Sequence, residues 1–135
     1  MTPDELLARL APVPYLVNGA DFNGLDCWGL VEVWYRDVLG IEVSDRKAHI
    51  SAPDGLSAGF DARQDWLPGD QQDHAVWTAR AFAGDGLIIE HGHCGILWQG
   101  RAYHMHRNGG FQHAHPGDRK LRINGFWIHK CLKSL

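Results

Sequence analysis

Cysteine is scarce in this chain, which has only three in 135 residues. Small domains held together by disulfides use an even number of closely spaced cysteines. Cys27, Cys94 and Cys131 are far apart and include no C-x-x-C pair, which argues against a disulfide framework. We expect reduced thiols, with Cys94 and Cys131 buried as structural residues and Cys27 available for chemistry.

An excess of positive charge is also missing, because 13 Lys and Arg stand against 16 Asp and Glu, for a net charge of −3. We therefore expect no binding of nucleic acid or of an acidic membrane surface. No apolar run approaches the roughly 20 residues of a membrane-spanning helix. Residues 1–5 are acidic and lack the basic-then-apolar pattern of a secretory signal, so we expect synthesis in the cytoplasm without a signal peptide.

The chain does contain enough apolar residues, 44%, for the core of a single domain over residues 1–135. Residues 2–5 resemble a capping box with proline at the first helical position, which predicts a short helix that ends before Pro12. A second helix is predicted over 27–39, because its apolar residues recur at helical spacing. Asp26 is its expected N-cap, and Gly40 its stop signal.

The second half of the chain is expected to form strands. Residues 44–72 have an irregular composition, with a helical turn expected near 56–66, and such excursions often border a binding site or cover it as a lid. The later segments with strand-like patterns are 86–90, 93–98, 102–106 and 121–128, while 75–82 is ambiguous between strand and helix. Gln99-Gly100-Arg101 is expected to form a hairpin turn. Helices followed by strands predict an α+β domain, with N-terminal helices packed on a mostly antiparallel sheet.

Cys27 is the first candidate for a functional residue. A thiol at a helix N-terminus feels the positive end of the helix dipole, which favours the nucleophilic thiolate. Gly29 keeps the first helical turn slim, so that another element can approach it. The alternative is a small core residue at the start of a buried helix.

The nine histidines supply candidate bases for this thiol. His93 opens a strand-like segment, and His104 lies on the facing arm of the expected hairpin, so the two side chains are expected to meet. His93 would then be the general base, oriented by a hydrogen bond to His104. His49, His113 and His115 are expected on the solvated surface, and His129 in a structural or exposed place.

A zinc site is the rival interpretation, with ligands from His91, His93, His104 and His106, because H-x-H pairs point to one side of a strand. No H-E-x-x-H helix or C-x-x-C pair accompanies them. We therefore expect no metal and no cofactor. Trp28, directly after Cys27, is equally compatible with packing and with substrate contact.

These residues together resemble the NlpC/P60 family of papain-like cysteine peptidases. Residues 26–31 resemble the family's nucleophile region, and Tyr15 lies at the family's spacing before Cys27. Residues 84–89 resemble the Gly-Asp pair and the apolar strand that precede the family's catalytic histidine. Residues 93–96 resemble its His-Val-Gly-Ile segment. Residues 103–104 resemble the strand that carries its third catalytic residue. Cys94 stands where the family commonly has valine.

The resemblance implies a hydrolase that cuts amide bonds in the stem peptides of peptidoglycan. Cys27 would be the nucleophile, His93 the general base, and His104 the orienting residue, although a shortened hairpin leaves His106 as an alternative. Tyr15 would help to bind the substrate or the oxyanion. Asp26 and Trp28, on either side of the nucleophile, are the other expected substrate-binding residues.

The tryptophan after the cysteine and the sequence of residues 39–41 resemble one branch of the NlpC/P60 family. Members of this branch are found in tail-tip and tail-assembly proteins of phages and prophages. This implies action at the cell wall, with phage tail proteins as partners. Two alternatives stay open: a tail component whose catalytic residues are inert, and an amidase effector delivered against competing bacteria.

Overall fold

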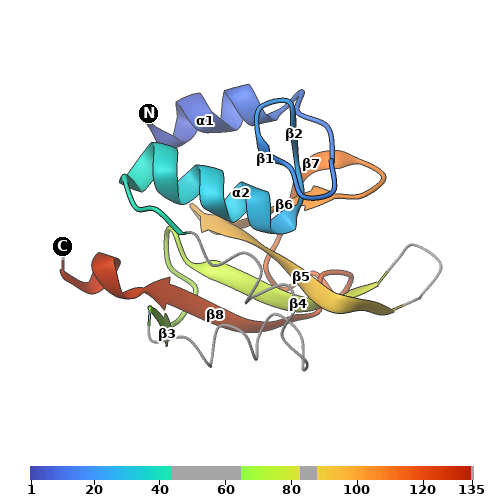
Figure 1. Ribbon diagram of the computed structural model, residues 1–135. Coiled ribbons are helices and arrows are strands. Elements are labelled where there is room, and N and C mark those ends of the chain that lie inside the picture. Colours follow the sequence, from blue (N-terminus) through green and yellow to red (C-terminus); the bar gives the residue numbers. More distant parts are fainter. Residues whose placement is uncertain (44–64, 83–87, 135) are drawn as a thin grey trace.

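The computed structural model describes residues 1–43, 65–82 and 88–134, and it places the helices over one face of a large sheet (Figure 1). The helical segments are α1 (Pro3–Leu10), α2 (Cys27–Trp34), the π-helical turn η1 (Tyr35–Leu39) and the 3-10 turn η2 (Lys130–Ser134). The strands are β1 (Ala20–Asp21), β2 (Gly24–Leu25), β3 (Trp66–Pro68), β4 (Val76–Phe82), β5 (Ile88–Trp98), β6 (Arg101–His106), β7 (Gly110–Ala114) and β8 (Ile123–His129). The predicted α+β class is confirmed.

The first two helices begin and end where local signals predict. The Thr2 hydroxyl accepts the N–H of Glu5 at 3.2 Å and caps α1. α2 and η1 together cover the expected helix, and Gly40 follows in the left-handed conformation with φ 68°. The π-helical turn was not predicted.

The described strands form a two-stranded sheet, β1-β2, and a six-stranded sheet in the order β3-β8-β4-β5-β6-β7. All neighbouring strands of the larger sheet are antiparallel, as predicted. Gln99 and Gly100 form the turn between β5 and β6, with φ of 49° and 77°. Two residues with positive φ are typical of the tight hairpin turn expected there.

Several strand predictions need correction. The segments 86–90 and 93–98 belong to one strand, β5, from Ile88 onward, and the ambiguous segment 75–82 is the strand β4. The segment 121–128 contributes β8, which lies between β3 and β4.

The expected irregular excursion falls mostly outside the described residues. The last residues of this segment are described. Trp66 opens the strand β3 and pairs with His129, so the helical turn predicted near 56–66 is wrong at this residue. The predictions that the segment forms a lid and that His49 is exposed concern residues outside the described part of the chain. That residues 1–135 form a single domain stays a prediction. Within the described part of the chain, no helix is both long and apolar enough to cross a membrane.

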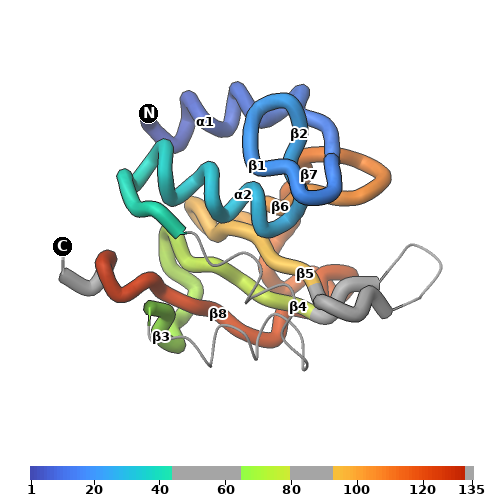
Figure 2. Tube along the Cα trace, viewed as in Figure 1, coloured from blue at the N-terminus to red at the C-terminus, as the bar shows by residue number. Residues whose placement is uncertain are grey.

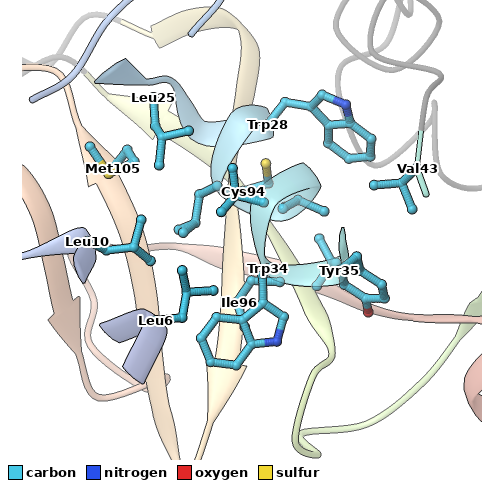
Figure 3. Close-up of a cluster of buried hydrophobic side chains, with 14 of the residues drawn as sticks. Leu6, Leu10, Leu25, Trp28, Trp34, Tyr35, Val43, Cys94, Ile96 and Met105 are labelled. Atoms are coloured by element: carbon cyan, nitrogen blue, oxygen red, sulfur yellow. The ribbon is translucent and has the colours of Figure 1, made fainter. Parts of the chain in front are cut away.

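Two apolar clusters cover the two faces of the larger sheet. The helices pack on one face, where Leu6 of α1, Trp34 of α2 and Ile96 of β5 lie together (Figure 3). The second cluster, on the other face, includes Trp77 and Leu97. The apolar side of α2 is therefore buried against the sheet, and this packing holds the N-terminus of α2 near β5.

A close backbone contact joins α2 to the segment that precedes it. A Cβ atom at Gly29 would overlap the carbonyl oxygen of Gly19. The slim helical turn expected at Gly29 is thus required by the contact, because any side chain there would push the segment away.

We predict that Gly29→Ala destabilises the fold by about 1–3 kcal/mol, as overpacking does in a close contact. Helix propensity alone would favour alanine by about 1 kcal/mol, so the direction of the change distinguishes the two effects. Urea unfolding measures it. Gly40→Asn is the control, because a Cβ at Gly40 meets nothing within 4 Å and asparagine tolerates the left-handed region. A Gly29→Ala protein more stable than the wild type would contradict the prediction.

Candidate functional site

The N-terminus of α2 is held by the carboxylate of Asp26, which is only 5% exposed. One carboxylate oxygen accepts the N–H of Gly29 at 2.7 Å, and the other accepts the N–H of Asn18 at 3.0 Å. The first bond caps the helix, and the second ties the preceding loop to it. Asp26 was predicted to bind substrate, and the structure places it as the N-cap and as an anchor of the loop.

Cys27 is the first residue of α2, and its side chain is half-buried. The pKa of the Cys27 thiol is held well below its usual range, chiefly by a hydrogen bond with Cys94 and then by a hydrogen bond with His93 and the charge of that ring. Burial and the carboxylate of Asp26 act in the opposite direction. The favourable contacts prevail, so the site stabilises a thiolate.

His93 and His104 meet as expected. The Nε2 atom of His93 lies 2.8 Å from Nδ1 of His104, and the rings stand nearly perpendicular, at 85°. The strand β4 shows a register shift just beyond Ala79, which pairs with His93 on β5. Such bulges re-aim neighbouring side chains and often occur beside functional sites.

His104 is buried, with 6% of its surface exposed. Burial, followed by the nearby ring of His93, lowers the pKa of His104 to about 3. The ring is therefore neutral near pH 7 and able to accept a hydrogen bond through an unprotonated nitrogen.

The two imidazoles rest against Trp77, a buried residue of β4. The Trp77 ring makes edge-on contacts with His93 at 5.4 Å and with His104 at 5.7 Å between ring centroids. Gly95 leaves room for it, since a Cβ there would lie 2.6 Å from the indole. The role of Trp77 was not predicted, because a tryptophan in a strand carries no sign of which residues it will support.

Tyr15 lies beside the nucleophile segment, where it forms an isolated bridge with Leu25. Burial, followed by the negative charge of Cys27, raises the pKa of Tyr15, and a hydrogen bond from Arg107 opposes this rise. The phenol is therefore protonated at neutral pH and lies within the electrostatic reach of Cys27. Arg107 was not predicted, because its approach depends on a turn more than ninety positions along the chain.

Trp28 is completely buried and packs edge-on against Trp66, with ring centroids 6.4 Å apart. Between packing and substrate contact, this burial favours packing.

The remaining candidates are distributed as follows. His106, the alternative third residue, lies with its ring 6.2 Å from that of His104 and accepts the N–H of Asn108, so it faces the turn after β6. His113 and His115 are exposed as predicted, although His113 lies in β7. His129 is buried against Trp66, which is a structural place.

Two cysteine predictions need revision. Cys131 was expected to be buried but is exposed. Cys94 is buried as expected, yet its thiol contacts Cys27, so it does more than fill the core. Its position directly after His93 was the only sequence signal for this contact.

The zinc alternative depends on four histidines, of which the side chain of His91 lies outside the described residues. Among the residues that the structure describes, no group of three or more His, Cys, Asp or Glu is arranged to hold a metal ion.

Known proteins resemble this chain in sequence pattern and in fold. The profile of the NlpC/P60 family matches residues 12–123. A similar solved structure is the crystal structure of the NlpC/p60 domain of the peptidoglycan hydrolase SagA, with a TM-score of 0.57 and 16% sequence identity, covering 93% of this chain and 92% of that chain. This likeness confirms the predicted papain-like NlpC/P60 fold. No curated protein matches the sequence significantly.

We predict that Cys94→Val raises the pKa of Cys27, because the main hydrogen bond that stabilises the thiolate is lost. The pH dependence of Cys27 alkylation by iodoacetamide, followed by mass spectrometry, measures the change. Cys131→Ala, at the exposed cysteine, is the control. An unshifted profile in Cys94→Val would show that Cys94 does not stabilise the thiolate.

We predict that the lowered pKa of His104 makes the fold less stable in acid. Its pKa is about 3 in the fold against an ordinary 6.5, so the unfolded chain binds this proton more readily between those values. Stability should therefore fall as pH drops from 6.5 toward 3, by up to about 1.4 kcal/mol per pH unit for this proton. Urea unfolding of wild type and His104→Gln across this range isolates the effect, because the other titrating groups are shared. Equal slopes for the two proteins would contradict it.

Proposed function

Because the chain belongs to the NlpC/P60 family, we propose that it is a cysteine peptidase that hydrolyses amide bonds in the stem peptides of peptidoglycan. The observation that carries the proposal is the position of Cys27 at the N-terminus of α2, where Cys94 and His93 lower the pKa of its thiol. The related SagA domain is described as part of a peptidoglycan hydrolase, which supports the choice of substrate.

In the proposed reaction the Cys27 thiolate attacks the carbonyl carbon of the scissile amide and forms a carbon–sulfur bond. The negative charge moves to the carbonyl oxygen, where the unpaired backbone N–H groups typical of a helix N-terminus stabilise it. The imidazolium of His93 gives its proton to the leaving nitrogen as the carbon–nitrogen bond breaks. A thioester on Cys27 and a free amine result.

Water then completes the reaction. Neutral His93 removes a proton from a water molecule, whose oxygen attacks the thioester, and the carbon–sulfur bond breaks to give a carboxylic acid and the Cys27 thiolate. His104 is the proposed orienting residue. A neutral His104 ring accepts the Nε2–H of His93, which leaves Nδ1 of His93 for the thiol.

Tyr15 is the proposed substrate-binding residue nearest the nucleophile. Its protonated phenol is a hydrogen-bond donor close to Cys27, suited to the oxyanion or to a substrate carbonyl. Asp26 takes part indirectly, because it holds the helix end from which Cys27 projects.

We further propose that the enzyme acts at the cell wall as part of a phage or prophage tail. The support is the tryptophan at position 28 and the residues 39–41, which resemble the tail-associated branch of the family. Purification of particles from an induced lysogen, with detection of this chain by mass spectrometry in the tail fraction, tests the location. Recovery only as free protein would contradict it.

We predict that Cys27→Ala abolishes the release of products from purified peptidoglycan fragments, measured by mass spectrometry, since no other group replaces the attacking sulfur. Circular dichroism should show an unchanged fold, because the cap of α2 does not depend on the thiol. Cys131→Ala, which also removes one thiol, should retain activity.

The inert alternative makes the opposite prediction. If the wild type releases no product and Cys27 alkylates only like an ordinary thiol, with a pKa near 8.5, the chain is a structural component. Unchanged product release by Cys27→Ala would reject the proposed mechanism.

A further inference from the structure

The turn between β6 and β7 packs against the segment that precedes the nucleophile. Figure 2 shows the β6–β7 hairpin beside the loop that carries β1 and β2. At Gly110, with φ 71°, a Cβ would lie 3.5 Å from the carbonyl oxygen of Val13, an ordinary van der Waals distance. Within the turn, the N–H of Gly109 donates to the carbonyl of His106 at 3.2 Å. The turn is therefore closed by an internal hydrogen bond and lies next to Val13.

Arg107 projects from this turn over Tyr15. The central carbon of its guanidinium lies 6.0 Å from the centroid of the Tyr15 ring. Tyr15 in turn forms a bridge with Leu25, two positions before Cys27. The guanidinium therefore lies over a residue that is paired with the segment leading into Cys27, although Arg107 is an exposed residue.

No carboxylate of the described residues forms an ion pair with Arg107. The sequence from 91 to 117 contains no Asp or Glu, so the hairpin supplies no negative charge of its own. Asp26 is the acidic residue beside Cys27, and both of its oxygens accept backbone N–H groups. The site therefore presents a cation that the described part of the protein does not neutralise.

We propose that Arg107 binds a free carboxylate of the substrate and so selects peptides that carry a negative charge beside the scissile amide. This inference rests on the proposed peptidase function. A guanidinium suits the task, because its planar fork donates two parallel hydrogen bonds to a carboxylate. The Tyr15 phenol, which accepts a hydrogen bond from Arg107, holds the fork in place and leaves its remaining donors for the substrate.

The test compares two synthetic stem peptides that differ only in the carboxyl group next to the scissile amide, which is free in one and amidated in the other. For the wild type, kcat/KM should be about tenfold or more higher on the acid than on the amide, since a charge-assisted hydrogen bond is lost with the amide. In Arg107→Gln this ratio should fall close to one, with the loss on the acid mainly in KM. Arg107→Lys should keep an intermediate ratio, because an ammonium supplies charge without the fork.

Arg101→Gln is the matched control, because Arg101 is another exposed arginine of the same hairpin and contacts His113 instead of Tyr15. It removes the same charge and should keep the wild-type ratio. A lowered ratio in both variants would assign the effect to net charge and overturn the role of Arg107.

The outcomes separate this inference from the function on which it rests. Cleavage of both peptides by the wild type at equal rates, or an unchanged ratio in Arg107→Gln, overturns the carboxylate role and leaves the peptidase standing. If neither peptide is cleaved while Cys27 still reacts with iodoacetamide at low pH, the peptidase function fails and the inference fails with it.

Discussion

The site depends on the carboxylate of Asp26, because it joins two pieces of chain that must stay together. One oxygen caps α2 at Gly29, and the other holds the loop through Asn18. The close contact between Gly19 and Gly29 leaves no space for either piece to shift. Cys27 begins the capped helix, so this unit positions the backbone from which its sulfur projects. A buried carboxylate with both oxygens bonded is stable in such a place.

The chemistry of Cys27 then follows from what the sheet brings to it. Burial alone would keep the thiol protonated, but Cys94 and His93 of β5 stabilise the thiolate more strongly than burial opposes it. His104 is kept neutral by burial, so its ring can accept a hydrogen bond from His93, 2.8 Å away. Trp77 supports both rings from β4. Arg107 adds a cation at the outer side of the site, which gives the proposed peptidase a basis for choosing among peptides.

Much of this arrangement was predictable, and the parts that were not share a cause. The caps of α1 and α2 and the turn at Gln99 are signalled by residues within four positions of each other, and all three are present. The meeting of His93 and His104 followed from strand alternation across one hairpin. The place of β8 between β3 and β4 was not predicted, because no local sequence pattern records the order of strands in a sheet.

The amino-acid sequence by itself determined the helix ends, the strand-rich second half, the family and the candidates Cys27, His93 and His104, because each depends on local hydrogen bonding, periodicity or a motif in one stretch of chain. Only the tertiary structure decided that Cys94 stabilises the Cys27 thiolate and that Arg107 reaches Tyr15. Those contacts join residues more than sixty positions apart. Their strength depends on distances and burial, which exist only once α2 and the β6–β7 hairpin have packed around β5.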